Sequence, residues 1–170
     1  LGYVLQDPHL FSGTIRENIK YGKLDASDEE VYRAAALVQA DTVAARMPEG
    51  YDTQVGEGGD RLSTGEKQLI AFARAIITDP PIFVLDEATS SIDTEMEQHI
   101  QSAISHVLTG RTSFIIAHRL STIRNADIIL VVHDGKIIER GTYSQLMAQG
   151  GHFADLYNAL RIEESSDKGG

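Results

Sequence analysis

The stretch Ile82-Phe83-Val84-Leu85-Asp86-Glu87 decides the fold of this chain. Its four apolar residues have the length and composition of a buried β-strand. Two adjacent carboxylates, Asp86 and Glu87, follow at the strand's carboxyl end. Sites that hydrolyse phosphoanhydride bonds place a metal ligand beside a general base in this way. The stretch therefore predicts a strand that delivers a reactive pair of carboxylates.

A second informative stretch, Leu62-Ser63-Thr64-Gly65-Glu66-Lys67-Gln68, lies shortly before this strand. Its small residues open a predicted long helix, whose apolar face is formed by Leu69, Phe72, Ala73 and Ile76. The free N–H groups and the positive end of such a helix suit phosphate oxygens. The two stretches in this order predict a phosphate-binding segment followed by a hydrolytic one.

Working outward, the second half of the chain alternates predicted strands and helices, which favours a parallel sheet with helices on its faces. Strands are expected at 2–5, 82–86, 112–117 and 127–132, and Asp134-Gly135 is typical of a hairpin turn. The predicted fold class is α/β. We expect a sheet core from 1–6 and 81–160, a helical subdomain at 7–80 and a flexible tail at 161–170. Within the helical subdomain, Ser12 and the capping box at Ser27 predict helix starts, and 50–61 are expected to form an exposed loop.

Composition narrows the possible functions. The chain has 170 residues, no cysteine and a formal net charge of −10. The missing cysteines exclude a disulfide framework within it. The acidic balance disfavours a protein that binds nucleic acid through its phosphate backbone. No apolar run approaches the length of a membrane span.

Five segments in a fixed order resemble the ATP-binding cassette (ABC) ATPases, and in particular their exporters. The signature segment 62–68 and the Walker B strand 82–87 are two of these. Residues 3–19 resemble the Q-loop region, 90–93 the D-loop, and 115–121 the segment that carries the switch histidine. Residues 54–59 resemble a short loop found in exporters. The resemblance covers residues 1 to about 160 and implies a partial RecA-like sheet with an inserted helical subdomain.

The resemblance implies Mg-ATP hydrolysis, with Glu87 as the general base and His118 as the switch residue near the γ-phosphate. It implies that Asp86 and Gln6 hold Mg²⁺, and that Gln6 also contacts the attacking water. Each residue has an ordinary structural alternative. Glu87 is also compatible with an acidic helix start, Gln6 with a loop amide, and His118 with a strand-end residue.

In ABC ATPases, ATP lies between two domains. The resemblance therefore implies contacts to a nucleotide held by a second ABC domain. The contacting residues would be Ser63, Thr64, Gly65, Glu66 and Gln68 of the signature segment, with Ser91 and Asp93 of the D-loop. Ser63 alone is also compatible with a helix N-cap. Thr64 stands where the family usually has glycine, which suggests a heterodimer with one weakened site.

The same resemblance assigns Glu57 to contact with a transmembrane domain, although a solvated loop glutamate is an equal alternative. It places the protein at the cytoplasmic face of the cell membrane, with ATP, a second ABC domain and a transmembrane domain as partners. An ABC ATPase of DNA repair or translation is the alternative function, and a non-catalytic interaction fragment is another.

The chain contains no Gly-x-x-x-x-Gly-Lys-[Ser/Thr] motif, the loop that cradles nucleotide phosphates. We therefore expect a carboxyl-terminal part of a nucleotide-binding domain that is inactive alone. Because the strand that carries this loop would be missing, we also expect Ile82–Leu85 to form an unpaired apolar edge that promotes self-association.

Overall fold

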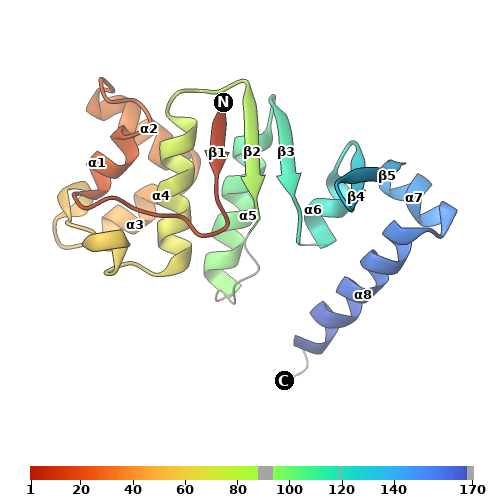
Figure 1. Ribbon diagram of the computed structural model, residues 1–170. Coiled ribbons are helices and arrows are strands. Elements are labelled where there is room, and N and C mark those ends of the chain that lie inside the picture. Colours follow the sequence, from red (N-terminus) through yellow and green to blue (C-terminus); the bar gives the residue numbers. More distant parts are fainter. Residues whose placement is uncertain (88–93, 119, 168–170) are drawn as a thin grey trace. The chain divides into compact units, whose positions relative to one another are not determined.

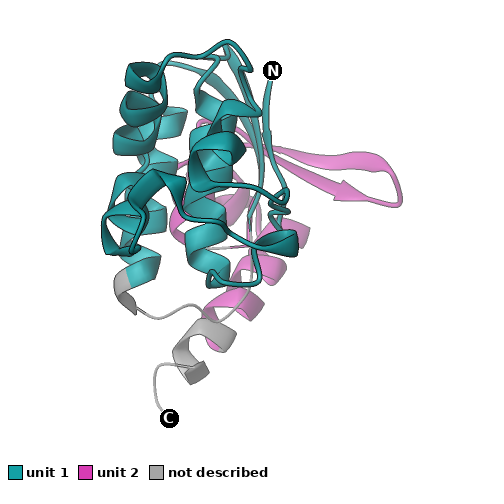
Figure 2. Cartoon of the chain, turned by 90° about the vertical axis from the view of Figure 1, so that its left-hand side faces the viewer, with its two compact units in different colours: residues 1–116 teal, residues 117–170 magenta. Residues whose placement is uncertain are grey.

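The computed structural model describes residues 1–87, 94–118 and 120–167. The chain divides into two compact units, residues 1–116 and 117–170 (Figure 2). Each unit has its own apolar core. Ser91 and Asp93, predicted to contact nucleotide, lie outside the described residues. The predicted separation of a sheet core from a helical subdomain at 7–80 remains a prediction.

Unit 1 is built on a three-stranded parallel sheet (Figure 1). Its strands are β1 (Gly2–Val4), β2 (Ile82–Asp86) and β3 (Thr112–Ile116), in the order β1-β2-β3. Val84 lies between Tyr3 of β1 and Phe114 of β3. The prediction that β2 would be an unpaired edge is therefore wrong, because its backbone groups are paired on both sides. The outer edges of this sheet belong to β1 and β3.

The helices of unit 1 are α1 (Ile15–Lys20), α2 (Asp28–Leu37), α3 (Ala40–Arg46), α4 (Thr64–Ile76) and α5 (Thr94–Leu108). Capping boxes open α1, α2 and α4, at Thr14, Ser27 and Ser63. The boxes at Ser27 and Ser63 start helices where the sequence predicted them. The first helix, however, is capped by Thr14 and not by Ser12, because Glu17 stands three residues after Thr14 and completes its box.

Helix α4 lies at the centre of unit 1, in contact with α1, α2, α3, α5 and β1 (Figure 1). The side chains of Leu69 and Phe72 are fully buried, as its apolar face predicted. Phe83 and Leu85 of β2 are also fully buried, on one face of the sheet. The side chains that alternate with them are more accessible. Tyr3, Ile82, Phe114 and Ile116 are 42–57% exposed.

Residues 50–61, expected as an exposed loop, are only partly so. They contain two short 3₁₀ helices, η1 (Gly50–Asp52) and η2 (Glu57–Gly59). Val55, between them, is fully buried, and its N–H donates to the carbonyl of Gly13 over 2.9 Å. The composition of this segment predicted exposure because glycines and acidic residues surround Val55, whose buried side chain anchors the segment.

Unit 2 consists of α6 (Leu120–Asn125), β4 (Ile129–His133), β5 (Lys136–Gly141), α7 (Tyr143–Gln149) and α8 (His152–Asp167). Strands β4 and β5 form the predicted antiparallel hairpin. A small core contains Val131, Leu146, Phe153 and Tyr157. Helix α8 continues through Asp167, so residues 161–167 are helical where the sequence predicted a tail, and the expected flexibility of this segment remains a prediction. No glycine or proline interrupts the sequence between Leu160 and Gly169 to stop the helix.

No helix in the described parts of the chain is long and apolar enough to cross a lipid bilayer.

Candidate functional site

The carboxyl ends of the three parallel strands meet at one edge of the unit 1 sheet. Val4 lies opposite Leu85, so Gln6 follows the end of β1 beside the end of β2, where Asp86 and Glu87 lie. Gln6 is exposed, Asp86 is half-buried and Glu87 is buried. Polar residues at the carboxyl ends of adjacent parallel strands are where open α/β sheets bind their ligands. This edge is the candidate site.

Glu87 is the most enclosed residue of this edge. Only 1% of it is exposed, and its backbone N–H donates to the carbonyl of Ile116 over 3.1 Å. That bond ties the end of β2 to the end of β3. Burying a carboxylate is costly unless it is hydrogen-bonded or paired. Its burial suits a general base held in one orientation, and the role of Glu87 remains a prediction.

His118 belongs to unit 2, where its side chain is exposed. In the chain it follows Ile116, the last residue of β3, by two positions. The structure thus brings Gln6, Asp86 and Glu87 to one edge. It assigns His118 to the other unit.

The signature segment places Ser63 at the N-cap of α4, with an exposed side chain. Its Oγ accepts a hydrogen bond from the N–H of Glu66 over 3.3 Å, and the Glu66 carboxylate accepts the N–H of Ser63 over 2.8 Å. Thr64, the first helical residue, is exposed. Ser63 therefore acts as the N-cap of α4, and Glu66 completes the capping box. An N-cap that faces solvent is still able to meet a ligand.

Gly65 and Gln68 are buried, unlike the residues before them. A Cβ on Gly65 would lie 2.3 Å from Cγ of Met96 and 3.0 Å from its Sδ. Gly65 is therefore required by the packing of α4 against α5, apart from any phosphate. Gln68 is 1% exposed, and its Oε1 accepts no hydrogen bond from the described residues. Glu57, expected to contact a transmembrane domain, is exposed in η2.

Sequence reasoning missed a polar network that joins the segment after Gln6 to α1 and α4. The buried Asn18 accepts the N–H of Phe11 through Oδ1 and donates through Nδ2 to the carbonyls of Phe11 and Thr14, over 2.9–3.0 Å. Arg74 of α4 donates to the Asn18 carbonyl, to its Oδ1 and to the His9 carbonyl, each over 2.9 Å. Burial lowers the pKa of Arg74.

Asn18 lies in the segment 3–19 that resembles the Q-loop region. A polar residue on the buried side of a short helix was the signal that could have revealed its role. The network fixes the chain that leaves the candidate site relative to the helix that begins at Ser63.

Residues 1–90 match the ABC transporter family. The chain belongs to this family. It is 52% identical, over 94% of its length, to the uncharacterized ABC transporter ATP-binding protein YfiC of Bacillus subtilis, and covers 26% of that protein. It is 50% identical to an ATP-dependent lipid A-core flippase of Legionella pneumophila, over 95% of the chain and 28% of the flippase.

Among solved structures, the chain is similar to a bacterial Atm1-family ABC exporter with ATP bound. The TM-score is 0.81 with 45% sequence identity, over 96% of this chain and 28% of the exporter. At this identity, the likeness shows the fold to be that of an ABC nucleotide-binding domain, as predicted. The chain spans only about a quarter of the length of these relatives.

The residues at the candidate edge fit the Mg²⁺ that the family implies. Asp86 offers a carboxylate and Gln6 an amide oxygen, the hard donors that Mg²⁺ prefers. No group of three or more metal-binding His, Cys, Asp or Glu side chains occurs among the residues placed by the structure. Mg²⁺ usually keeps several waters and binds one or two carboxylates together with substrate phosphates, so a sparse donor set suits it.

Proposed function

We propose that this chain is part of the ATP-hydrolysing domain of an ABC exporter, which couples Mg-ATP hydrolysis to transport across a membrane. The observation that carries the proposal is the edge where the buried Glu87 follows the half-buried Asp86 beside Gln6. The relatives support it, since one is an ATP-dependent flippase and another is an exporter with ATP bound. Alone, these residues lack a phosphate-cradling motif, so the chain by itself is proposed to be inactive.

In the proposed mechanism, Glu87 accepts a proton from the water that attacks the γ-phosphate. A buried general base is held in one orientation, which keeps the water aligned with the bond to be broken. Asp86 and Gln6 would hold Mg²⁺, which when bound neutralises charge on the phosphate oxygens. Gln6 also orients the attacking water. His118 donates a hydrogen bond to the γ-phosphate.

The proposed partners are ATP, a second ABC domain and a transmembrane domain, at the cytoplasmic face of the membrane. The exposed start of α4 supports the second of these, because Ser63 and Thr64 face solvent and can meet a phosphate held by another domain. Gly65, Glu66, Gln68, Ser91 and Asp93 are proposed to belong to the same interface. Exposed Glu57 is proposed to contact the transmembrane domain. Thr64 in place of glycine suggests that the second domain is a different chain.

The test is Glu87→Gln in the full-length protein. The amide keeps the shape of the side chain but cannot accept the proton, so ATP turnover should fall about 10²- to 10⁴-fold while ATP binding is retained. Turnover is measured by phosphate release, and binding by equilibrium dialysis with Mg-ATP. The matched control is Glu49→Gln, which changes an exposed glutamate away from the edge. Retained turnover in Glu87→Gln would overturn the assignment.

A further inference from the structure

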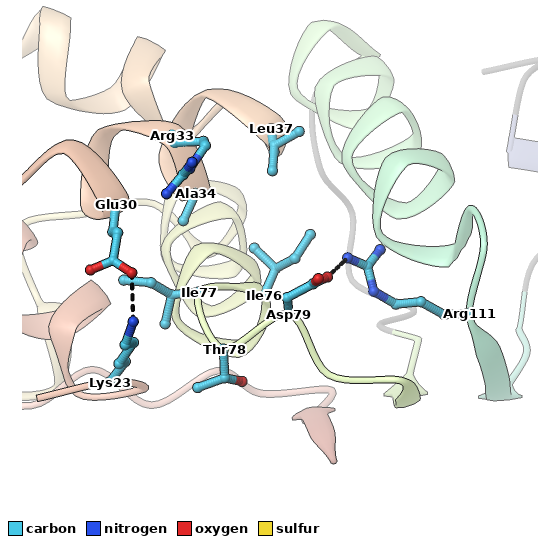
Figure 3. Close-up of a pocket in the computed structure, with 10 residues that line it drawn as sticks. All are labelled: Lys23, Glu30, Arg33, Ala34, Leu37, Ile76, Ile77, Thr78, Asp79 and Arg111. Carbon is cyan, nitrogen blue, oxygen red and sulfur yellow. Dashed lines mark hydrogen bonds and ion pairs between the residues drawn. The ribbon is translucent and has the colours of Figure 1, made fainter. Parts of the chain in front are cut away.

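A cleft of about 650 Å³ lies within unit 1, away from the candidate site (Figure 3). Residues of α2 line it together with the end of α4 and the turn that follows. It sits near the carboxyl end of α4, whereas Ser63 lies at the amino end. At 1.5 Å per residue, the two ends of this helix are about 20 Å apart. Small-molecule sites commonly have about 300–1,000 Å³.

The floor of the cleft is apolar and its walls are charged. Ile76 is buried, Ile77 is half-buried and Leu37 is 45% exposed. Figure 3 shows an ion pair on either side of the two isoleucines, between Lys23 and Glu30 and between Arg111 and Asp79, each at 2.5 Å. These pairs fix the walls without covering the floor.

Arg33 is the charged residue of the lining that belongs to neither ion pair. It makes no hydrogen bond or ion pair with any residue that the structure describes. Glu30, three residues before it, interacts with Arg33 through its charge but forms no ion pair with it, because its carboxylate faces Lys23 and Ser27. One Glu30 oxygen holds Lys23, and the other accepts the N–H of Ser27 over 2.8 Å. The lining therefore carries three cations against two anions, in a chain whose net charge is −10.

We propose that this cleft binds a free anionic amphiphile, a carboxylate or phosphate monoester carried on an apolar chain. The anionic head pairs with Arg33, whose planar guanidinium suits both groups. The apolar chain lies over Ile77 and Leu37, above the buried Ile76, and removes the exposed surface of these two side chains from water. An exposed ion pair alone contributes little, so the apolar floor supplies most of the affinity and Arg33 selects the sign of the charge.

The experiment titrates the chain with monomeric decanoate, below its micellar concentration, and follows backbone amides by NMR. The expected result is saturable shifts at Ala34, Leu37, Ile77 and Thr78, and much weaker shifts with decyltrimethylammonium. Arg33→Ala should weaken decanoate binding about threefold, whereas Arg33→Lys should largely retain it. The matched control is Arg140→Ala, which removes an exposed arginine of β5.

Four results would overturn the proposal. One is the absence of shifts at the cleft amides. Another is equal binding of the cationic and anionic probes. A third is an Arg33→Ala variant that binds decanoate as the unchanged chain does. The fourth is co-sedimentation with phosphatidylglycerol vesicles that depends on Arg33 without binding of monomeric decanoate, which would assign the cleft to a membrane surface. Arg33 is exposed, so its replacement is expected to leave the fold intact.

Discussion

At the scale of single residues, Gly65 shows how one position serves two demands. The family resemblance assigns Gly65 a contact with a nucleotide held by a second domain. The structure adds that α5 leaves no room for a side chain, because Met96 occupies the space of a Cβ. Close packing of two helices therefore restricts this position whether or not a nucleotide is bound.

Gly65→Ala is expected to destabilise the chain by about 1–3 kcal/mol, because the methyl group overpacks the contact with Met96. Helix propensity alone would act in the opposite direction, by up to about 1 kcal/mol. Urea unfolding measures the change. In a Met96→Ala background the same substitution should become neutral or stabilising, so a double-mutant cycle gives a coupling energy. A coupling near zero would contradict the steric explanation.

The sequence alone could predict the structural roles of some residues but not of others. The caps at Ser27 and Ser63 were predictable because a capping box spans only four residues. The burial of Glu87 was not, since it depends on β3 and the Ile116 carbonyl, distant in sequence. The sequence shows that Asp86 and Glu87 are adjacent, but only the fold shows that Glu87 is buried.

At the scale of elements, Asn18 and Arg74 join α1, α4 and the segment that follows Gln6. Asn18→Ala leaves the Phe11 N–H, the Phe11 carbonyl and part of Arg74 without their partner. The free energy of unfolding should fall by about 2–3 kcal/mol, because buried polar groups lose hydrogen bonds. Urea unfolding is the measurement, and Asn158→Ala, on an exposed site of α8, is the control. Equal stability of the two variants would show that the network is dispensable.

One face of the unit 1 sheet exposes apolar side chains of β3. Phe114 and Ile116 of β3 are 57% and 55% exposed, on the side of the sheet opposite the buried Phe83 and Leu85. Parallel sheets are normally covered on both faces, so this exposed apolar surface favours self-association. Replacing both residues with lysine should shift the chain toward monomer in light scattering at high concentration.

The matched control is Ile137→Lys, because Ile137 of β5 is 59% exposed on the separate hairpin. An equal effect of this control would show that association does not depend on the β3 surface. The earlier expectation placed this tendency at the edge of β2. It failed because strand order cannot be read from local pattern, and β1 and β3 both pair with β2.

At the scale of the whole molecule, the two units differ in the size of their cores. The core of unit 1 draws buried residues from β1, β2 and α1 to α5, and the half-buried Ile115 of β3 packs against it. That of unit 2 rests on Val131, Leu146, Phe153 and Tyr157. The α/β class and the order of most helices and strands were predictable from periodicity. The boundary between units was not, because it reflects contacts between residues far apart in sequence.

Hydrogen exchange should report this difference. Amides in β4, β5 and α7 are expected to exchange at least about tenfold faster than those in β2 and α4, because a smaller core opens more readily. Mass spectrometry of peptic peptides measures the rates, after correction for the intrinsic exchange of each sequence. Equal protection in the two units would show that they open as one cooperative body.

The pairing of Gly2 with Phe83 also has a consequence for synthesis on the ribosome. The two residues are 81 positions apart (83 − 2), so β1 leaves the ribosome long before its partner exists. At about 5–20 residues per second, the wait is roughly 4–16 s. The capped helices between them depend on neighbours within a few residues and can form during that interval. The nascent chain is therefore expected to hold helices before it holds a sheet.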